Sequence, residues 1–194
     1  MLDDYRVLDL TDQNGIFCGY ILAYLGADVV MLEPPGGRSE RVQHELLWQS
    51  YARGKASLEI DIAAERESFA ELVRQSDFLI ESCTQTERQR LGLGYEELKR
   101  IKPDLIYLSN TGFGHTGPWR SYAGIGRMFE LTCGLSNFTG YLDEGPRRVG
   151  KAFFDLHVGW TAVFAILAAL HYRQRTGIGQ WIDFAMYQVG VSTM

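Results

Sequence analysis

The sequence predicts an α/β protein whose open, Rossmann-like parallel sheet carries helices on both faces. Short apolar segments typical of buried strands alternate with helical segments along most of the 194 residues. Clusters of glycine and proline separate many of these segments. The composition, with 46% hydrophobic and 22% charged residues, is that of an ordinary globular domain. Because strand–helix–strand units produce parallel strands covered on both faces, the alternation indicates a doubly covered sheet.

The first two predicted strands enclose an apolar helix. RVLDL at residues 6–10 is typical of a short buried strand, and Gly15 opens an apolar helix that runs to Leu25. ADVVMLE at 27–33 forms the second strand, which the Pro-Pro-Gly-Gly turn at 34–37 closes. This is the first strand–helix–strand unit of the sheet.

Two further strands follow in the middle of the chain. ASLEID at 56–61 alternates apolar and polar residues, as an edge strand does, and Asp61 is placed to cap the next helix. DFLIES at 77–82 is the third buried strand, with helical pieces around 86–91 and 95–101 behind it.

The fourth buried strand, LIYLSNTG, leads into a loop rich in turn residues, GFGHTGP at 112–118. Residues 151–194 then differ in character from the Rossmann-like part at 1–150, although we assign both to one unit. An apolar helix at roughly 156–173 precedes WIDFAM, a strand that enters another helix. The chain stops inside an element, so we expect it to belong to a larger unit or to need a second chain.

Charge and composition disfavour several classes of partner. The net charge of −5 argues against general binding to nucleic acid or to an anionic membrane. The longest apolar run, at 160–170, is too short to cross a bilayer, and the acidic N-terminus does not resemble a signal peptide. An odd number of widely spaced cysteines suggests free thiols and a cytoplasmic location. The four histidines are scattered, so we expect no metal site.

Ligands of parallel sheets bind at the carboxyl ends of the strands, which here lead into the loops at 11–15, 34–41, 82–90 and 110–118. The first of these loops lacks the G-x-G-x-x-G fingerprint, so a nicotinamide dinucleotide is disfavoured. Arginines gather in GGRSER and ERQRLG, and the planar guanidinium suits phosphate. A phosphate-bearing ligand fits this pattern.

Asp155 stands alone among apolar residues ahead of the long helix, and it has two interpretations. Aspartate is a preferred N-cap residue, and local sequence alone favours that structural role. At a helix N-terminus the carboxylate would stay ionised, because free N–H groups and the helix dipole favour the anion. An ionised carboxylate in a water-poor pocket is also a competent nucleophile toward an activated acyl group.

The motifs, taken in order, resemble those of the class III coenzyme A transferases, the family that includes formyl-CoA and carnitine CoA transferases. RVLDLT is followed by LGADVVMLEPPGG, and ARGKASLEID by LIYLSNTGFGHTGP. DLHVGWTAVFAILAALHYRQRTGIGQWIDFAM matches the last motif. The resemblance covers residues 6–188 and corresponds to the N-terminal half of the family's subunits.

The resemblance implies that Asp155 is the catalytic nucleophile, since it occupies the position of the family's aspartate. The implied reaction passes through a mixed anhydride and then an aspartyl-CoA thioester on Asp155. Coenzyme A enters as acyl-CoA, and no metal takes part. The positions implied to bind coenzyme A are Gln13, Asn14, Arg38, Ser82, Cys83, Arg90 and Leu91. Arg38 is a substitute here, because Pro34 stands where some members have an arginine.

Other functions on the same scaffold stay open. Acyl-CoA racemases of this superfamily use a histidine in a G-H-D segment, which reads Gly124-Ile125-Gly126 here, so this segment speaks against racemisation. The same change removes an acid that some transferases keep near the nucleophile. A lyase, or a CoA-binding or assembly domain inactive without its missing half, are the remaining alternatives. The family's interlocked dimers imply a homodimer, or a partner chain that supplies the C-terminal half.

Overall fold

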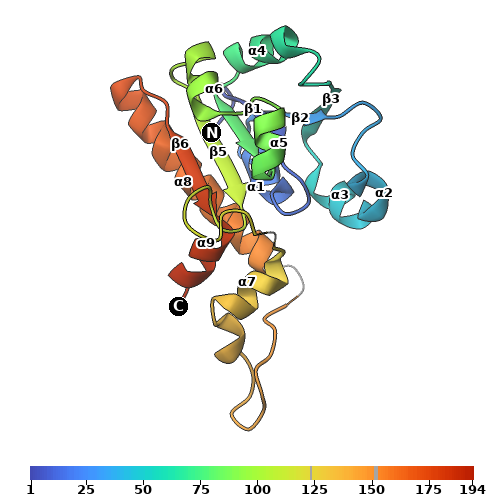
Figure 1. Cartoon of the computed structure of the whole chain (residues 1–194), viewed down its shortest axis with the longest axis vertical. Coiled ribbons are helices and arrows are strands. Elements are labelled where there is room, and N and C mark those ends of the chain that lie inside the picture. Colours follow the sequence, from blue (N-terminus) through green and yellow to red (C-terminus); the bar gives the residue numbers. More distant parts are fainter. Residues whose placement is uncertain (123, 151–152) are drawn as a thin grey trace.

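The computed structural model describes residues 1–122, 124–150 and 153–194. Its centre is one six-stranded sheet in which every neighbouring pair is parallel, in the order β3-β2-β1-β4-β5-β6 (Figure 1). The predicted parallel α/β class is therefore confirmed, and the segment at 56–61 does supply an edge strand. The strands are β1 (Arg6–Leu10), β2 (Asp28–Glu33), β3 (Lys55–Glu59), β4 (Phe78–Glu81), β5 (Ile106–Thr111) and β6 (Trp181–Ala185).

Helices cover both faces of this sheet, because the strand residues alternate between two cores. Val7 and Phe78 belong to a core shared with α1 and α8. Their neighbours Leu8 and Leu79 belong to the opposite core, shared with α4 and α6. The helices are α1 (Ile16–Tyr24), α2 (Glu40–Gln43), α3 (Glu45–Tyr51), α4 (Arg66–Arg74), α5 (Gln85–Arg90), α6 (Tyr95–Ile101), α7 (Gly126–Thr132), α8 (Phe153–Thr176) and α9 (Met186–Ser192).

The strand order reverses direction between β1 and β4, the first strands of the two halves of the sheet. In doubly wound sheets the loops that leave neighbouring strands at such a point diverge to opposite faces and leave a crevice. The ligand site is therefore expected where β1 and β4 end, beside Leu10 and Glu81.

Helix α8 is longer than the eleven-residue apolar run in the sequence. Among the described residues it is the one helix that is long and apolar enough to cross a membrane by length and composition alone. Nearly half of its most apolar window is buried, and Val158, Ala162 and Ile166 lie in the core against α1 and the sheet. This packing is typical of a core helix.

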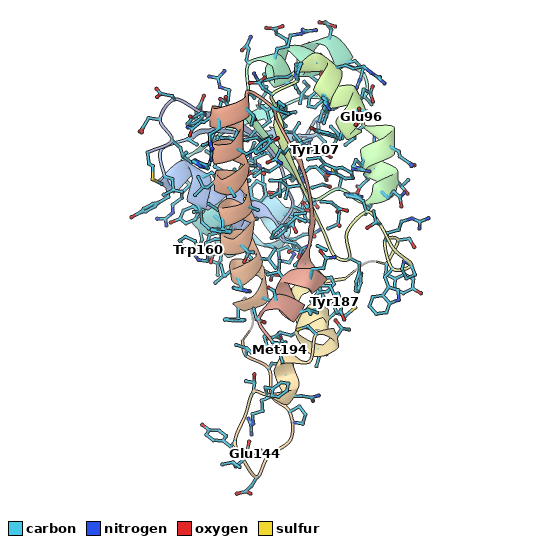
Figure 2. The ribbon with its side chains drawn as sticks, turned by 90° about the vertical axis from the view of Figure 1, so that its left-hand side faces the viewer. Glu96, Tyr107, Glu144, Trp160, Tyr187 and Met194 are labelled. Carbon is cyan, nitrogen blue, oxygen red and sulfur yellow. The ribbon has the colours of Figure 1, made fainter. Side chains whose placement is uncertain are left out.

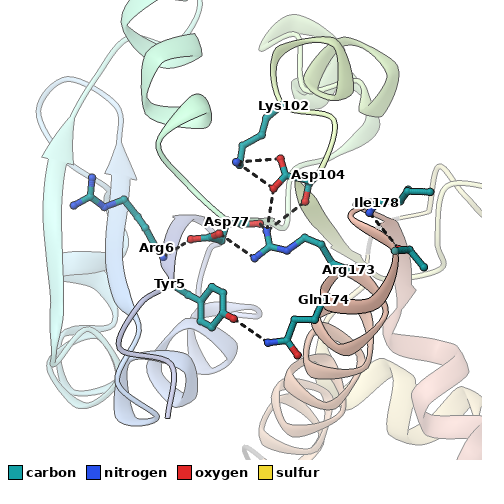
Figure 3. Close-up of polar contacts among 9 residues, drawn as sticks. Tyr5, Arg6, Asp77, Lys102, Asp104, Arg173, Gln174 and Ile178 are labelled. Atoms are coloured by element: carbon teal, nitrogen blue, oxygen red, sulfur yellow. Dashed lines mark hydrogen bonds and ion pairs between the residues drawn. The ribbon is translucent and has the colours of Figure 1, made fainter.

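A polar cluster connects the C-terminal end of α8 to the segments that precede β4 and β5, at the opposite ends of these strands from the expected site (Figure 3). Arg173, nearly buried, donates through Nη2 to Asp77 Oδ1 at 2.9 Å and through Nη1 to the carbonyl oxygens of Asp77 and Asp104 at 3.3 Å. Asp77 also accepts a hydrogen bond from the backbone N–H of Arg6. Arg173, the first arginine of the RQRTG segment, therefore has a structural role.

Two local predictions need correction, and one pair of short helices was not predicted. The segment at 38–51 forms the short helices α2 and α3, for which the sequence shows no clear periodic signal. Asp61 does not cap α4, because its side chain accepts from Ala63 and Ala64 in a turn that precedes the helix. Helix α8 already includes Phe153, so Asp155 lies inside its first turn and not at the N-cap.

After α7 the chain runs through a short 3-10 helix (Leu135–Asn137) into a segment that projects away from the sheet. Figure 2 shows Glu144 near the tip of this projection, far from the labelled Tyr107 in the sheet. The projection returns toward the start of α8, so α7 and the first turn of α8 come together beneath the sheet.

Candidate active site

A cleft of about 470 Å³ opens where β1, β4 and β5 end. Its walls come from the loops after these strands and from the segment at 120–124, apart from residue 123, which is not described. The residues that matter for the site's chemistry are Asp12, Asn14, Ser82, Cys83, Asn110 and His115. The cleft therefore occupies the crevice that the strand order creates.

A buried ion pair holds the loop after β1. Lys55 Nζ lies 2.8 Å from Asp9 Oδ2, and both side chains are almost completely buried. The same ammonium donates to the carbonyl oxygen of Ile16 at the start of α1. The other carboxylate oxygen of Asp9 accepts from the N–H and the hydroxyl of Thr11. Strand β3, strand β1 and helix α1 are thus fixed together at the entrance to the loop.

Asp12 then joins the two sides of the crevice. Its backbone N–H donates to Ser82 Oγ at 2.7 Å, and Ser82 Oγ donates to Asp12 Oδ1 at 2.8 Å. Asn14 packs against the same carboxylate through its backbone and side-chain N–H groups. Three residues from two loops therefore form one rigid polar wall of the cleft.

Asp155 lies in the first turn of α8 and is half-buried. A Cβ atom added to Gly126 would lie only 2.4 Å from Asp155 Oδ1, so the carboxylate occupies the space that any other residue at 126 would need. Asp155 Oδ1 is buried and makes no hydrogen bond within the described residues. A desolvated carboxylate oxygen without a donor is reactive, because no hydrogen bond stabilises its negative charge.

The surroundings raise the pKa of Asp155 to about 6, chiefly through burial and further through the negative charges of Asp12 and Glu130. Burial and the two neighbouring acids therefore oppose the stabilisation of the anion that a helix N-terminus provides. The carboxylate is still mostly ionised at neutral pH, but its ionisation lowers the stability of the folded state.

Glu130, on α7, is an acid whose proximity to Asp155 could not be assumed from the sequence. Its side chain is about 1% exposed, and its carboxylate accepts from Arg148 at 3.3 Å and from the backbone N–H of Val149 at 3.1 Å. These contacts fix Glu130 close enough to Asp155 for its charge to act there. No local pattern in the sequence signals this pairing, because the two residues belong to different elements.

The predicted coenzyme A positions are only partly brought together. Asn14, Ser82 and Cys83 line the cleft, while the described lining of the cleft does not include Gln13. Burial raises the pKa of the Cys83 thiol well above its ordinary value, so this cysteine is no nucleophile.

The remaining predicted positions lie beside the cleft. Arg38 donates through Nη2 to the carbonyl oxygens of Leu10 and Leu32, which places its guanidinium at the ends of β1 and β2. Arg90 is exposed at the end of α5, and Leu91 follows it against the core under α4 and α6. A ligand that touched all of these residues would extend over the rim of the cleft.

A buried hydrogen-bonded chain behind the cleft was missed at the sequence level. Glu81 is fully buried at the end of β4, and its Oε1 accepts from Tyr107 at 2.8 Å and from the hydroxyl of Ser109. Ser109 Oγ in turn contacts Nε2 of His115, which lines the cleft. The available signal was a polar residue in each of two buried strands: Glu81 at the end of FLIE and Ser109 within IYLSNT.

The fold defines a doubly wound α/β domain with a cleft at the ends of its central strands. Asp155 is not among the described residues that line this cleft; it packs against Gly126, two residues along the chain from the lining residue Gly124. A sequence model described as CoA-transferase family III matches residues 2–194, and the chain belongs to this family. The resemblance inferred from the motifs is thereby confirmed.

Characterised relatives and a solved structure are similar to the chain over almost its whole length. Succinyl-CoA–D-citramalate CoA-transferase of Chloroflexus aurantiacus is 38% identical over 96% of this chain and 49% of the relative. Acetyl-CoA:oxalate CoA-transferase of Acetobacter aceti is 39% identical over 95% and 50%. The crystal structure of a CAIB/BAIF family protein from Brucella suis superposes with a TM-score of 0.92 at 37% identity, over 98% of this chain and 54% of that one. The chain spans about half the length of these relatives.

Proposed function

We propose that the protein transfers coenzyme A from an acyl-CoA donor to a carboxylic acid, with Asp155 as the nucleophile. The observation that carries the proposal is the unpartnered, half-buried carboxylate of Asp155 packed against Gly126 in a family III chain. The relatives named above support the reaction class, since their names describe transfer of coenzyme A between an acyl-CoA and an acid.

In the first half of the proposed reaction, a carboxylate oxygen of Asp155 attacks the thioester carbonyl of the donor, and the C–S bond breaks to release CoA thiolate. The product is a mixed anhydride. The thiolate then attacks the Asp155 carbonyl carbon, so that an aspartyl-CoA thioester forms and the donor leaves as its carboxylate. The first step needs an ionised aspartate that water does not shield, which agrees with the burial of Asp155.

In the second half, the acceptor carboxylate attacks the aspartyl thioester and CoA thiolate leaves again. The thiolate then attacks the acceptor's acyl carbon in the new anhydride, which regenerates the Asp155 carboxylate and releases the acyl-CoA product. No proton is gained or lost overall, and no step draws on a metal. The negative charges of Asp12 and Glu130 raise the free energy of the ionised Asp155 carboxylate, which favours its acylation and disfavours the last step, in which the free carboxylate is released.

Coenzyme A would lie along the strand ends, between the polar wall of Asn14 and Ser82 and the exposed guanidinium of Arg90. Arg38, Cys83, Gln13 and Leu91 complete the proposed contacts.

We also propose a second chain or a second copy over the outer side of α8. There Trp160 is 60% and Phe164 is 74% exposed, which is unusual for large apolar residues on one helix. A cytoplasmic location fits the three free cysteines.

The test is to incubate the 194-residue chain with an acyl-CoA and a carboxylate acceptor, and to trap intermediates with hydroxylamine for mass spectrometry. We expect modification at Asp155 in the wild type and none in Asp155→Asn. Asp143→Asn, which changes an exposed aspartate on the projecting segment, is the matched control and should behave like the wild type. Undiminished transfer by Asp155→Asn would refute the nucleophile. Incorporation of solvent deuterium at the α-carbon without transfer would favour the racemase alternative.

A further inference from the structure

The hydrogen-bonded residues Glu81, Ser109 and His115 connect a fully buried carboxyl group to the wall of the cleft. The three residues come from β4, β5 and the loop after β5, so separate parts of the fold converge on it. Asp183 on β6 holds the backbone N–H of His115 at 3.0 Å, and the imidazole ring packs on Trp181 with 5.8 Å between ring centres. The ring is therefore fixed both in position and in orientation.

The hydrogen bonds around Glu81 determine which way the protons point. Three donors converge on its carboxylate: the hydroxyl of Tyr107, the hydroxyl of Ser109 and the backbone N–H of Cys83. Each of these groups donates, and the carboxyl group of Glu81 accepts on both of its oxygens. Burial raises the pKa of Glu81 above its ordinary value, and the three donors and the positive charge of Arg88 offset this rise only in part.

The single hydroxyl proton of Ser109 is thus committed to Glu81. Ser109 Oγ then faces His115 Nε2 only with lone pairs, so Nε2 must carry a proton. Burial and the nearby charge of Arg88 lower the pKa of His115, while Asp183 opposes them, so the ring is neutral at pH 7. In a neutral imidazole protonated at Nε2, the other nitrogen, Nδ1, is a hydrogen-bond acceptor.

We propose that Ser109 and Glu81 lock His115 in its Nε2–H tautomer, so that Nδ1 accepts a hydrogen bond from an N–H group of the bound acyl-CoA. The inference rests on the proposed function, because it needs coenzyme A in this cleft. Within the described residues Nδ1 has no hydrogen-bond partner, although His115 lines the cleft. Coenzyme A offers such donors in the amides of its pantetheine arm and in the amine of its adenine.

Nitrogen-15 NMR of the labelled chain tests the tautomer directly. We expect the His115 signals of the free protein to show an unprotonated Nδ1 and a protonated Nε2, assigned among the four histidines with His115→Gln. Ser109→Ala should abolish the preference and mix the tautomers. Ser76→Ala, at the opposite end of the sheet with its hydroxyl on the carbonyl of Leu72, should leave the signals unchanged. A protonated Nδ1 in the wild type, which needs no variant to observe, overturns the proposal.

Titration with coenzyme A tests the contact. We expect the Nδ1 signal to move toward the hydrogen-bonded range, and His115→Ala to weaken binding about two- to tenfold, the usual effect of one neutral hydrogen bond. His115→Gln, which keeps an acceptor oxygen, should recover part of the loss. Pantetheine and 3′-phospho-ADP, added separately, identify which end of the ligand moves the signal.

Binding of coenzyme A with an unmoved Nδ1 signal overturns the contact and leaves the proposed function intact. Failure of the wild-type chain to bind coenzyme A in calorimetry refutes the proposed binding site, and this inference with it.

Discussion

The carboxylate of Asp155 occupies the position that a side chain on Gly126 would take, with 2.4 Å between Oδ1 and an ideal Cβ at 126. Helices α7 and α8 approach each other closely at this point because residue 126 has no side chain. The same glycine lies in the segment where relatives with racemase activity are expected to carry G-H-D. In this chain the segment therefore makes room for the Asp155 carboxylate and supplies no acid.

Substituting Gly126 by alanine tests this relationship. Because the new methyl group must displace the carboxylate, we expect Gly126→Ala to reduce the rate of Asp155 acylation about 100-fold, the loss that a 1 Å misplacement can cause. Mass spectrometry of the acylated chain after rapid quenching gives the rate. Gly94→Ala is the matched control, since a Cβ there meets nothing within 4 Å. Equal rates for both variants would show that the close packing at Gly126 has no role in acylation.

The raised pKa of Asp155 predicts a pH dependence of acylation. The nucleophile is the ionised form, so the rate should rise with pH through about 6 and level off above pH 7. Glu130→Gln removes one of the charges that raise this pKa, and its rate profile should move toward lower pH. A profile that is flat between pH 5 and 7 would contradict the assignment.

The raised pKa of Asp155 also predicts that the free energy of unfolding falls as the pH rises. Asp155 ionises less readily when folded, with a pKa of about 6 against an ordinary 3.8. The folded state therefore binds the proton more tightly, and the cost of the charge is absent below about pH 4 and complete above about pH 6.

Asp155→Asn removes that cost, so it should unfold at a higher urea concentration than the wild type at pH 7.5. The difference should shrink as the pH falls toward 4. An Asp155→Asn variant that is less stable than the wild type at pH 7.5 would show that the carboxylate stabilises the fold, as a cap would.

Arg90 is predicted to bind a phosphate of coenzyme A. Its guanidinium is exposed at the end of α5, beside the loop that carries Ser82 and Cys83. We expect Arg90→Ala to weaken binding of coenzyme A by about 1.5–3 kcal/mol, the usual range for hydrogen bonds to charged groups. Isothermal titration calorimetry measures the change, with the exposed Arg100 on α6 as the control position. Unchanged affinity would assign Arg90 to the solvated surface.

The sequence was sufficient for the strands and for most of the helices, because apolar runs and turn residues record local structure directly. It also located Asp155 near the start of α8, although it placed the helix a few residues too late. The charge environment of Asp155 could not be predicted from the sequence. Asp12 and Glu130 lie on separate elements, and only the folded chain brings their charges to one carboxylate.

The hydrogen bonds that link Glu81, Ser109 and His115 could not be predicted from the sequence for a related reason. A glutamate at the end of a strand and a serine within another are each unremarkable, and their proximity follows from the register of β4 against β5. Glu81 pairs with Ser109 across that register, so two neutral-looking positions become one buried network. Strand order and register are tertiary facts that periodicity does not encode.

The buried pair of Lys55 and Asp9 gives the last prediction. Neither side chain is exposed by more than 1%, and the pair also fixes Thr11 and the start of α1. Lys55→Met leaves the Asp9 carboxylate buried without its cation, so we expect a loss of about 3–5 kcal/mol in the free energy of unfolding, measured with urea. Adding Asp9→Asn removes the unpaired charge and keeps an acceptor for Thr11, so the double variant should recover most of that loss. If the double variant were no more stable than Lys55→Met, the loss would come from packing of the lysine stem and not from the stranded charge.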